Sequence, residues 1–471
     1  MLEGFSNKGM ITVALLFLVS EGIRQSGTLG QVIKKLLPQG KTTVFKAQLR
    51  ILPSVAFISA FLNNTPVVVI FAPIIKHWAK SVNLPATKFL IPLSYVTILG
   101  GICTLIGTST NLVVHGMILE AGFEGFSMFE LGKVGIFIAI AGIIYIFLFS
   151  KRLLPDARPD TAVPDEEVEE GEKLHRVEAV LGARFPGINK KLKDFNFQRH
   201  YGAEVKEIKT RNGQRFVSNL EEVVLHEGDT LVVMADDTFI PTWGESSVFV
   251  LLTNGNEPDT TGKKKKRWFA LLLLVLMIVG ATVGELPITK EMFPDIKLDM
   301  FFFVSITTII MAWTNLFPAR KYTKYISWDI LITIACAFAI SKAMVNSGVA
   351  DSVAKFIIGL SDDYGPHVLL AMVFIITNLF TELITNNAAA ALAFPLALSI
   401  SAQLGVSPTP FFVVICMAAS ASFSTPIGYQ TNLIVQGIGN YKFTDFVRIG
   451  LPLNIITFLI SIILIPLIWN F

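Results

Sequence analysis

Long apolar runs separated by short polar stretches make up most of the chain. Eight of them are long enough to cross about 30 Å of hydrocarbon. They cover residues 10–29, 89–119, 134–149, 268–286, 298–317, 328–345, 410–438 and 446–469. The pattern predicts a multi-pass membrane protein.

Two further apolar regions, residues 45–78 and 368–404, each contain a pair of asparagines near the middle. The pairs are Asn63-Asn64 and Asn386-Asn387. Amides are costly against lipid, so polar residues at that depth indicate a protein-lined interior. We expect each region to form a re-entrant hairpin of two half-helices.

Polar residues also interrupt two of the long runs, at residues 107–111 and 425–432. We expect helices that unwind at membrane depth. Non-helical backbone is tolerated there only beside protein or a watery cavity, so these breaks indicate a binding site.

The two halves of the membrane region repeat one another. The segment beginning at Ile11 aligns with the one beginning at Ile332, and GTSTNLVVHG at Gly107 aligns with GYQTNLIVQG at Gly428, both at an offset of 321. The asparagine pairs align at an offset of 323. A shared offset across separate segments predicts an internal duplication.

Basic residues near the span ends indicate which side faces the cytoplasm. Placing the clusters at 34–50, 76–80, 151–152, 263–267 and 320–324 inside puts the two hairpins on opposite sides of the membrane. The predicted fold is therefore an all-α polytopic membrane protein with two inverted repeats, each containing a re-entrant hairpin and a broken helix. The spans at 268–286 and 298–317 have no counterpart before residue 1, so we expect either a shorter first repeat or one lacking N-terminal helices.

Charge is concentrated in the middle of the chain. Residues 151–267 hold 40 of the 75 charged residues, whereas the whole chain is 52% hydrophobic with a mean hydropathy of +0.60. Strand-like alternation at 202–209 and 230–234 predicts a small α+β cytosolic insert there. The predicted domains are residues 1–152 for repeat 1, 153–262 for the insert, with linkers at 155–172 and 254–266, and 263–471 for repeat 2.

Several function classes are disfavoured by the same sequence. The chain lacks a nucleotide-binding glycine loop, a catalytic triad and metal-type cysteine spacing, so it is not expected to be an enzyme. The net charge of +3 and the absence of a basic patch argue against nucleic-acid binding.

The hairpin tips have the chemistry of an ion site. Pro66 after Asn64 and Thr65 is typical of a helix start, and a helix N-terminus attracts anions. The tip at Thr385 to Ala388 is expected to do the same from the other side. Amide and hydroxyl groups, with carbonyls freed by unwinding, could bind sodium without a carboxylate.

Glu382 is the acidic residue in the body of a hairpin, and an offset of 323 pairs it with Ser59. A carboxylate inside a membrane suggests proton or cation coupling. A structural role at the outer interface is an equal alternative.

Four segments resemble the divalent anion/sodium symporter family of the ion transporter superfamily, which includes citrate-transporter-like permeases. They are FLNNTPVVVIFAPII, GGICTLIGTSTNLVV, LITNNAAAALAFPLAL and STPIGYQTNLIV. The insert, with LKDFNFQRHYGAEVKEIK and LHEGDTLVVM, resembles the C-terminal regulatory (RCK-type) domain of potassium-conductance regulators.

The resemblance implies sodium-coupled uptake of sulfate or a dicarboxylate through the inner or plasma membrane, by an elevator motion in a homodimer. It implies that the cytoplasmic insert binds an unknown small ligand. The implied substrate-binding residues are Asn64, Thr65, Asn387, Ala388, Thr110, Asn111, Thr431 and Asn432. The implied sodium-binding residues are Asn63, Asn64, Gly107, Asn386, Asn387 and Gly428.

The chain departs from the family pattern at Ala388, where a threonine hydroxyl is expected. This departure favours sulfate or another small oxyanion over a dicarboxylate. Two alternatives remain open: an antiporter or arsenite-type exporter of the same superfamily that uses Glu382, and a ligand-sensing membrane regulator.

Overall fold

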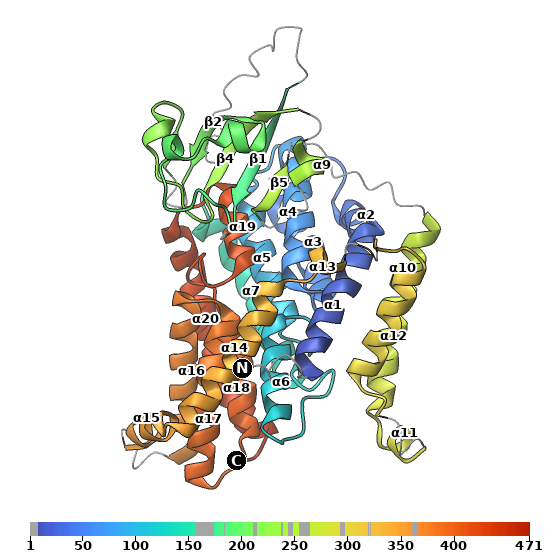
Figure 1. Cartoon of the computed structure of the whole chain (residues 1–471), viewed down its shortest axis with the longest axis vertical. Helices are drawn as coiled ribbons and strands as arrows, with labels where there is room; N and C mark the ends of the chain where they lie inside the picture. The colour runs from blue at the N-terminus through green and yellow to red at the C-terminus, as the bar shows by residue number, and fades with distance from the viewer. Residues whose placement is uncertain are drawn as a thin grey trace.

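A helical body carries a small sheet at one end (Figure 1). The computed structural model describes residues 8–156, 174–182, 184–210, 214–236, 239–243, 248–253, 264–292, 297–318, 320, 322–359 and 365–471. Most of both predicted linkers lies outside these residues.

The first half contains the two predicted interruptions. A gap at residues 60–63 separates α3 from α4, and a gap at 102–108 separates α5 from α6. The helices are α1 (Lys8–Gln25), α2 (Thr28–Leu36), α3 (Val44–Ser59), α4 (Asn64–Ser81), α5 (Thr87–Gly101), α6 (Ser109–Glu120) and α7 (Gly132–Leu153).

The second half has the same sequence of elements. Its helices are α14 (Trp328–Asn346), α15 (Val349–Gly359), α16 (Gly365–Leu383), α17 (Asn386–Leu404), α18 (Thr409–Ser420), α19 (Gln430–Gly439) and α20 (Phe443–Ile468). From α2 to α6 and from α15 to α19, corresponding helices begin 321 or 322 residues apart.

This spacing corrects the predicted alignment of the hairpin tips by one residue. Helix α4 begins at the second asparagine of its pair, Asn64, but α17 begins at the first of its pair, Asn386. Asn64 therefore corresponds to Asn386, and Thr65 corresponds to Asn387. The same shift pairs Glu382 with Ala60 instead of Ser59.

The last helices of the two halves pack side by side and run in opposite directions. The indole N–H of Trp469, just after α20, donates to Glu130, which lies just before α7 (3.1 Å). Midway, the Tyr145 hydroxyl of α7 donates to the Ile449 carbonyl of α20 (3.0 Å). The end of one helix thus meets the start of the other.

Apolar side chains cover the outside of the helical body. Among the described residues, five helices are long and apolar enough to cross a membrane, and a sixth span results if α14 and α15 are counted as one bent span. Along α20, an exposed stripe repeats at every fourth residue: Leu451, Ile455, Leu459, Ile463 and Leu467. Such a stripe faces lipid, and the protein is a multi-pass membrane protein.

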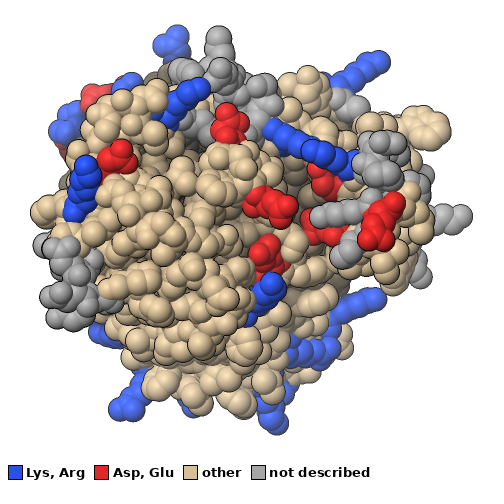
Figure 2. Space-filling view, turned by 90° about the horizontal axis from the view of Figure 1, so that it is seen from below, with Lys and Arg blue, Asp and Glu red and all other residues tan. Residues whose placement is uncertain are grey.

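Four helices precede the second half: α10 (Lys264–Gly284), α11 (Pro287–Met292), α12 (Met300–Trp313) and α13 (Tyr322–Tyr325). Helix α12 packs on both α1 and α10. Figure 2 shows the end of the molecule opposite the sheet, where most of the surface is uncharged and basic residues lie mainly at the rim.

Part of the insert is an antiparallel sheet of order β3-β2-β4-β1-β5. The strands are β1 (His175–Leu181), β2 (Glu204–Lys209), β3 (Arg215–Phe216), β4 (Thr230–Ala235) and β5 (Phe249–Thr253). The short helices are η2 (Leu192–Asp194), α8 (Phe197–Tyr201), η3 (Leu220–Glu222) and α9 (Phe239–Trp243). Aromatic side chains, including Phe185, Tyr201 and Phe249, give the sheet its own core, separate from that of the helical body.

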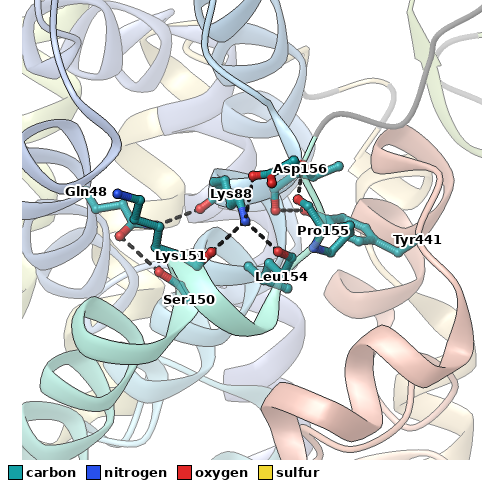
Figure 3. A network of polar contacts seen from close by, with 9 residues as sticks. Gln48, Lys88, Ser150, Lys151, Leu154, Pro155, Asp156 and Tyr441 are labelled. Atoms are coloured by element: carbon teal, nitrogen blue, oxygen red, sulfur yellow. Dashed lines mark hydrogen bonds and ion pairs between the residues drawn. The ribbon is translucent and has the colours of Figure 1, made fainter.

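A buried lysine fixes the point where the helical body leads into the insert (Figure 3). The Lys88 ammonium donates to the carbonyls of Lys151 (2.7 Å) and Leu154 (2.5 Å), at the C-terminus of α7. A cation there donates to carbonyls that have no partner within the helix. The negative end of the helix dipole stabilises its positive charge. The main-chain carbonyl of Lys88 accepts from Gln48 of α3 (2.6 Å), so the junction also holds the first hairpin.

Replacing Lys88 with Met should lower the thermal unfolding temperature of the purified protein. The variant keeps the apolar stem but removes the donor of two carbonyls, of which that of Leu154 is buried, and this costs about 1–3 kcal/mol. The matched control is Lys151→Met, because the Lys151 side chain is exposed. Equal unfolding temperatures for the two variants would contradict this role of Lys88.

Candidate functional site

The first hairpin tip places a buried amide among main-chain carbonyls. Asn64, the first residue of α4, is fully buried. Its amide is satisfied when the nitrogen donates to the carbonyls of Thr97 (3.0 Å) and Gly107 (3.2 Å) and to the Ser59 hydroxyl (2.7 Å), while the oxygen accepts from Tyr429 (2.6 Å). The reverse orientation would turn the amide oxygen toward acceptors.

The second tip is held by the break of the first half. Thr385 caps α17 by accepting from the Ala388 amide (3.4 Å). The next side chain, Asn386, donates to the Thr110 hydroxyl (2.7 Å). Asn387 accepts from the hydroxyls of Ser109 (3.2 Å) and Thr110 (3.4 Å).

The first tip makes the corresponding contacts with the break of the second half. The Thr65 hydroxyl donates to the Gln430 side chain (3.2 Å), which mirrors the contact of Asn387 with Ser109. Each hairpin tip is thus bonded to the broken helix of the other half. These contacts bring the two hairpin tips and the two helix breaks together at one centre.

Tyr429 links the parts of this centre, and the sequence analysis did not single it out. Its buried hydroxyl contacts the side chains of Asn64 and Asn386, one from each tip. It also bonds the Thr108 hydroxyl (2.8 Å), across a sequence separation of 321. Two residues separated by the predicted repeat offset therefore touch. The offset of 321 that pairs Tyr429 with Thr108 is the sequence feature from which its position could have been predicted.

The asparagines of the two breaks brace the unwound backbone. Asn111 donates to the carbonyls of Gly101 (3.5 Å) and Thr104 (2.9 Å). Asn432 donates to the carbonyls at the corresponding positions, Ser422 (2.8 Å) and Thr425 (3.1 Å). Both side chains are fully buried. They satisfy carbonyls freed by unwinding.

Thr431 and Ala388 differ in burial. The Thr431 hydroxyl is buried and accepts from Ser94 of α5 (2.8 Å). Ala388 is partly exposed in the first turn of α17. The sequence-predicted substrate residues thus differ in burial: Thr65 and Ala388 are partly exposed, whereas the others are buried, namely Asn64, Thr110, Asn111, Asn387, Thr431 and Asn432.

Two glycines allow the hairpins to approach the breaks closely. A Cβ at Gly107 would lie 2.5 Å from the carbonyl oxygen of Gly101 and 3.0 Å from that of Ala60. At Gly428 it would lie 2.0 Å from the Thr381 carbonyl oxygen and 2.2 Å from the Ser422 hydroxyl. Only glycine fits these contacts without displacing backbone.

Asn63, the residue before α4, borders a small cavity. It lines this cavity of about 10 Å³ together with Ser109 and residues of α1, including Ser20. This cavity separates the first tip from the neighbouring helix α1.

Helix ends supply the electrostatics of the centre. Helices α4, α6, α17 and α19 all begin there, and α3, α5, α16 and α18 all end there. The N-termini present free N–H groups and positive dipole ends, which attract an anion, and the C-termini present carbonyls, which attract a cation. Among the described residues, the hydrogen bonds that join each tip to the break of the other half are made by amides and hydroxyls, without a charged side chain.

Discontinuous helices that meet at membrane depth with both kinds of end define a membrane transporter. Comparison with known proteins agrees with this class. The citrate transporter family profile matches residues 1–400 and, in a second match, residues 296–470. The chain belongs to the citrate transporter family.

Three relatives show the range of the family. An uncharacterized transporter of Synechocystis sp. is 30% identical, over all of this chain and 90% of its own length. A Chlamydomonas reinhardtii protein, named for a proposed role as a sulfur deprivation response regulator, is 28% identical over 98% of this chain and 93% of its own length. Sodium/sulfate cotransporter 2 of the same organism is 32% identical, over 60% of this chain and 31% of its own length.

Proposed function

We propose that this transporter couples sodium to the uptake of a small divalent oxyanion, with sulfate the first candidate. The observation that carries the proposal is the meeting of four helix N-termini, two at the hairpin tips and two at the breaks. Their N–H groups, with Thr65 and the Gln430 side chain, would bind the anion without a basic residue. The cotransporter relative, whose name specifies sodium and sulfate, supports this choice.

The oxygens around Asn64 suit a sodium ion. The carbonyls of Thr97 and Gly107 and the hydroxyl of Ser59 converge on the Asn64 amide nitrogen. Rotation of the amide would replace that nitrogen with a fourth oxygen, and sodium in such transporters is bound by carbonyls of unwound helices. At the second tip, Asn386, Asn387 and Gly428 are the corresponding sodium-binding candidates.

The two halves would act as inverted repeats. The opposite directions of α7 and α20, and the exchange of contacts between tips and breaks, support this arrangement. Helices α3–α7 and α16–α20 pack mainly on one another, whereas α1, α10 and α12 form a second group. We propose that the first group carries the site as an elevator against the second group, which would form the homodimer.

The insert would be a cytoplasmic regulatory domain of the RCK type. Basic ends of α2, α4 and α7 lie at its end of the molecule, and the positive-inside rule supports a cytoplasmic position for that end. The sheet contacts the elements that bear the site. Glu178 of β1 pairs with Lys76 of α4 (3.1 Å) and with Lys209 of β2 (3.2 Å).

The broken helix α19 provides the second contact with the insert. A Cβ at Gly437 would lie 2.7 Å from the Thr230 hydroxyl, and a Cβ at Gly228 would lie 2.5 Å from Leu433. The sheet is thus packed against both α4 and α19, whose other ends form the site. A ligand that shifts the sheet would act directly on the site elements.

Neutralising Glu178 should loosen this contact. In Glu178→Gln, Lys76 and Lys209 lose their shared carboxylate, at a cost of about 1–3 kcal/mol. Hydrogen exchange should therefore become faster in β1 and in the C-terminal half of α4. The control is Lys191→Met, which removes an exposed pair with Glu222 within the insert. Unchanged exchange in α4 would contradict the coupling.

The pH dependence of this contact follows from the pKa of Glu178. Burial alone would raise that pKa, but the Lys76 and Lys209 ammonium groups outweigh burial and lower it from 4.5 to about 2. A lowered carboxyl pKa contributes stability that is fully present above the unfolded value and lost as pH falls toward 2. The contact should be constant near neutral pH and weaken only below about pH 4.5.

Uptake into proteoliposomes tests the proposed function. With an inward sodium gradient, labelled sulfate should accumulate, and replacing sodium with potassium should abolish the accumulation. Unlabelled dicarboxylates should compete weakly. The absence of sodium-dependent uptake for sulfate and dicarboxylates alike would reject the proposal.

A regulatory role is the second candidate, favoured by the sulfur-response name of one relative and by the packing of the insert on α4 and α19. Ligand binding to the intact protein without flux of any anion would support it.

A further inference from the structure

Glu382 lies in the last turn of α16, one turn before the second tip, and contacts two other elements. Its Oε1 atom accepts from the Ser424 main-chain N–H in the second break (2.8 Å). The same atom accepts from the side-chain amide of Asn454 on α20 (2.7 Å). The second N–H of that amide donates to the Ser424 hydroxyl (2.9 Å).

Two buried oxygens in this cluster have no hydrogen-bond partner. They are Oε2 of Glu382 and Oδ1 of Asn454. Asn454 is 6% exposed, so solvent does not supply the missing donor. The nearby Thr425 hydroxyl donates instead to the main-chain carbonyl of Glu382 (3.0 Å). Burying two unpaired acceptors is costly.

A negative charge on Glu382 would also lack a positively charged partner. Among the described residues, Glu382 forms no ion pair. The ionisable neighbour from the elements packed around it is Tyr95 of α5, whose hydroxyl donates to the Phe423 carbonyl (2.5 Å) and carries no positive charge. The C-terminal end of α16 disfavours an anion as well.

We propose that Glu382 and Asn454 form a proton-binding site, separate from the site between the tips. A proton on Oε2 lets that atom donate to Oδ1 of Asn454, while Oε1 keeps accepting from the Asn454 amide. The acid and the amide then form a doubly hydrogen-bonded pair in which each polar atom has a partner. Loss of the proton leaves a carboxylate and breaks one of the two bonds.

The position of this pair connects it with transport, and that connection rests on the proposed function. Glu382 belongs to the hairpin, Ser424 to the second break and Asn454 to α20. Relative motion of these elements would separate the acid from the amide and release the proton to water. The residue that corresponds to Glu382 in the first half is Ala60, which directly follows α3, so the first hairpin is not expected to hold a second proton site of this kind.

Infrared spectroscopy of the purified full-length protein tests the proton site without a transport assay. At neutral pH, the wild-type spectrum should contain a C=O stretching band of a protonated carboxylic acid. The band should vanish in Glu382→Gln, whose amide can still pair with Asn454. In Asn454→Leu it should shift, because the acid loses its partner. A wild-type protein without the band, or a band that survives in Glu382→Gln, would overturn the proposal.

Uptake measurements then test its use in transport. If anion uptake occurs, its rate should vary with pH in the wild type and lose that dependence in Glu382→Gln. An identical pH profile in both proteins would exclude Glu382 from coupling. If no anion is taken up at all, the proposed function fails while the infrared result still decides the proton site.

Discussion

Tyr429→Phe should reduce sodium-dependent anion uptake at least about tenfold while the protein stays folded. The variant removes only the hydroxyl that contacts both tips and Thr108. Buried groups deprived of a partner cost about 1–3 kcal/mol, and 1.4 kcal/mol corresponds to a factor of ten. Without the hydroxyl, Tyr429 no longer links Asn64 of the first tip to Asn386 of the second tip. Initial uptake rates at saturating and limiting sodium would measure it.

Tyr145→Phe is the matched control. This tyrosine is also buried and loses one hydroxyl bond, to the Ile449 carbonyl, but the bond joins α7 to α20 away from the tips. Its effect should appear in thermal stability and leave the sodium dependence of uptake intact. Equal uptake losses in both tyrosine variants would show that Tyr429 has no special place in the site.

Gly428→Ala should have the larger effect and abolish transport. The added methyl group would lie 2.0 Å from the Thr381 carbonyl oxygen, which is backbone and cannot rotate away. The second break and the second hairpin would have to separate. Overpacking costs typically about 1–3 kcal/mol and more where backbone must move. The purified yield, the thermal unfolding temperature and the rate of anion uptake should all decrease.

Gly359→Ala provides the comparison for this substitution. No heavy atom lies within 4 Å of a Cβ built at Gly359, near the end of α15. This variant should keep wild-type unfolding temperature and uptake. Normal uptake in Gly428→Ala would contradict the close approach of hairpin and break.

Interruption of apolar runs was the most informative sequence signal for the fold. Asn63-Asn64 and Asn386-Asn387 mark the points where α4 and α17 begin after the observed helix gaps, because amides need partners at membrane depth. Strand alternation likewise located β2 and β4. The register of the tips was harder to predict. Both pairs read Asn-Asn, and the choice of first helical residue depends on tertiary contacts such as those of Asn64 with Thr97 and Gly107.

The roles of single site residues are harder to derive from sequence than their location. Asn111 and Asn432 are predicted to bind substrate, and their amides also brace carbonyls of their own breaks. Tyr429 was overlooked because its counterpart is the small residue Thr108, and a hydroxyl that reaches two hairpins cannot be recognised from local spacing. Asn454 lies in an otherwise apolar helix far along the chain from Glu382, so only the fold brings them together.

A density map of the protein with sodium and sulfate would test the central claim most directly. We expect the oxyanion between the two tips, within reach of Thr65, Gln430 and Asn387, and a sodium ion beside Asn64 with the carbonyl of Gly107 turned toward it. Sulfate bound elsewhere, with the space between the tips unchanged, would contradict the assignment of the site.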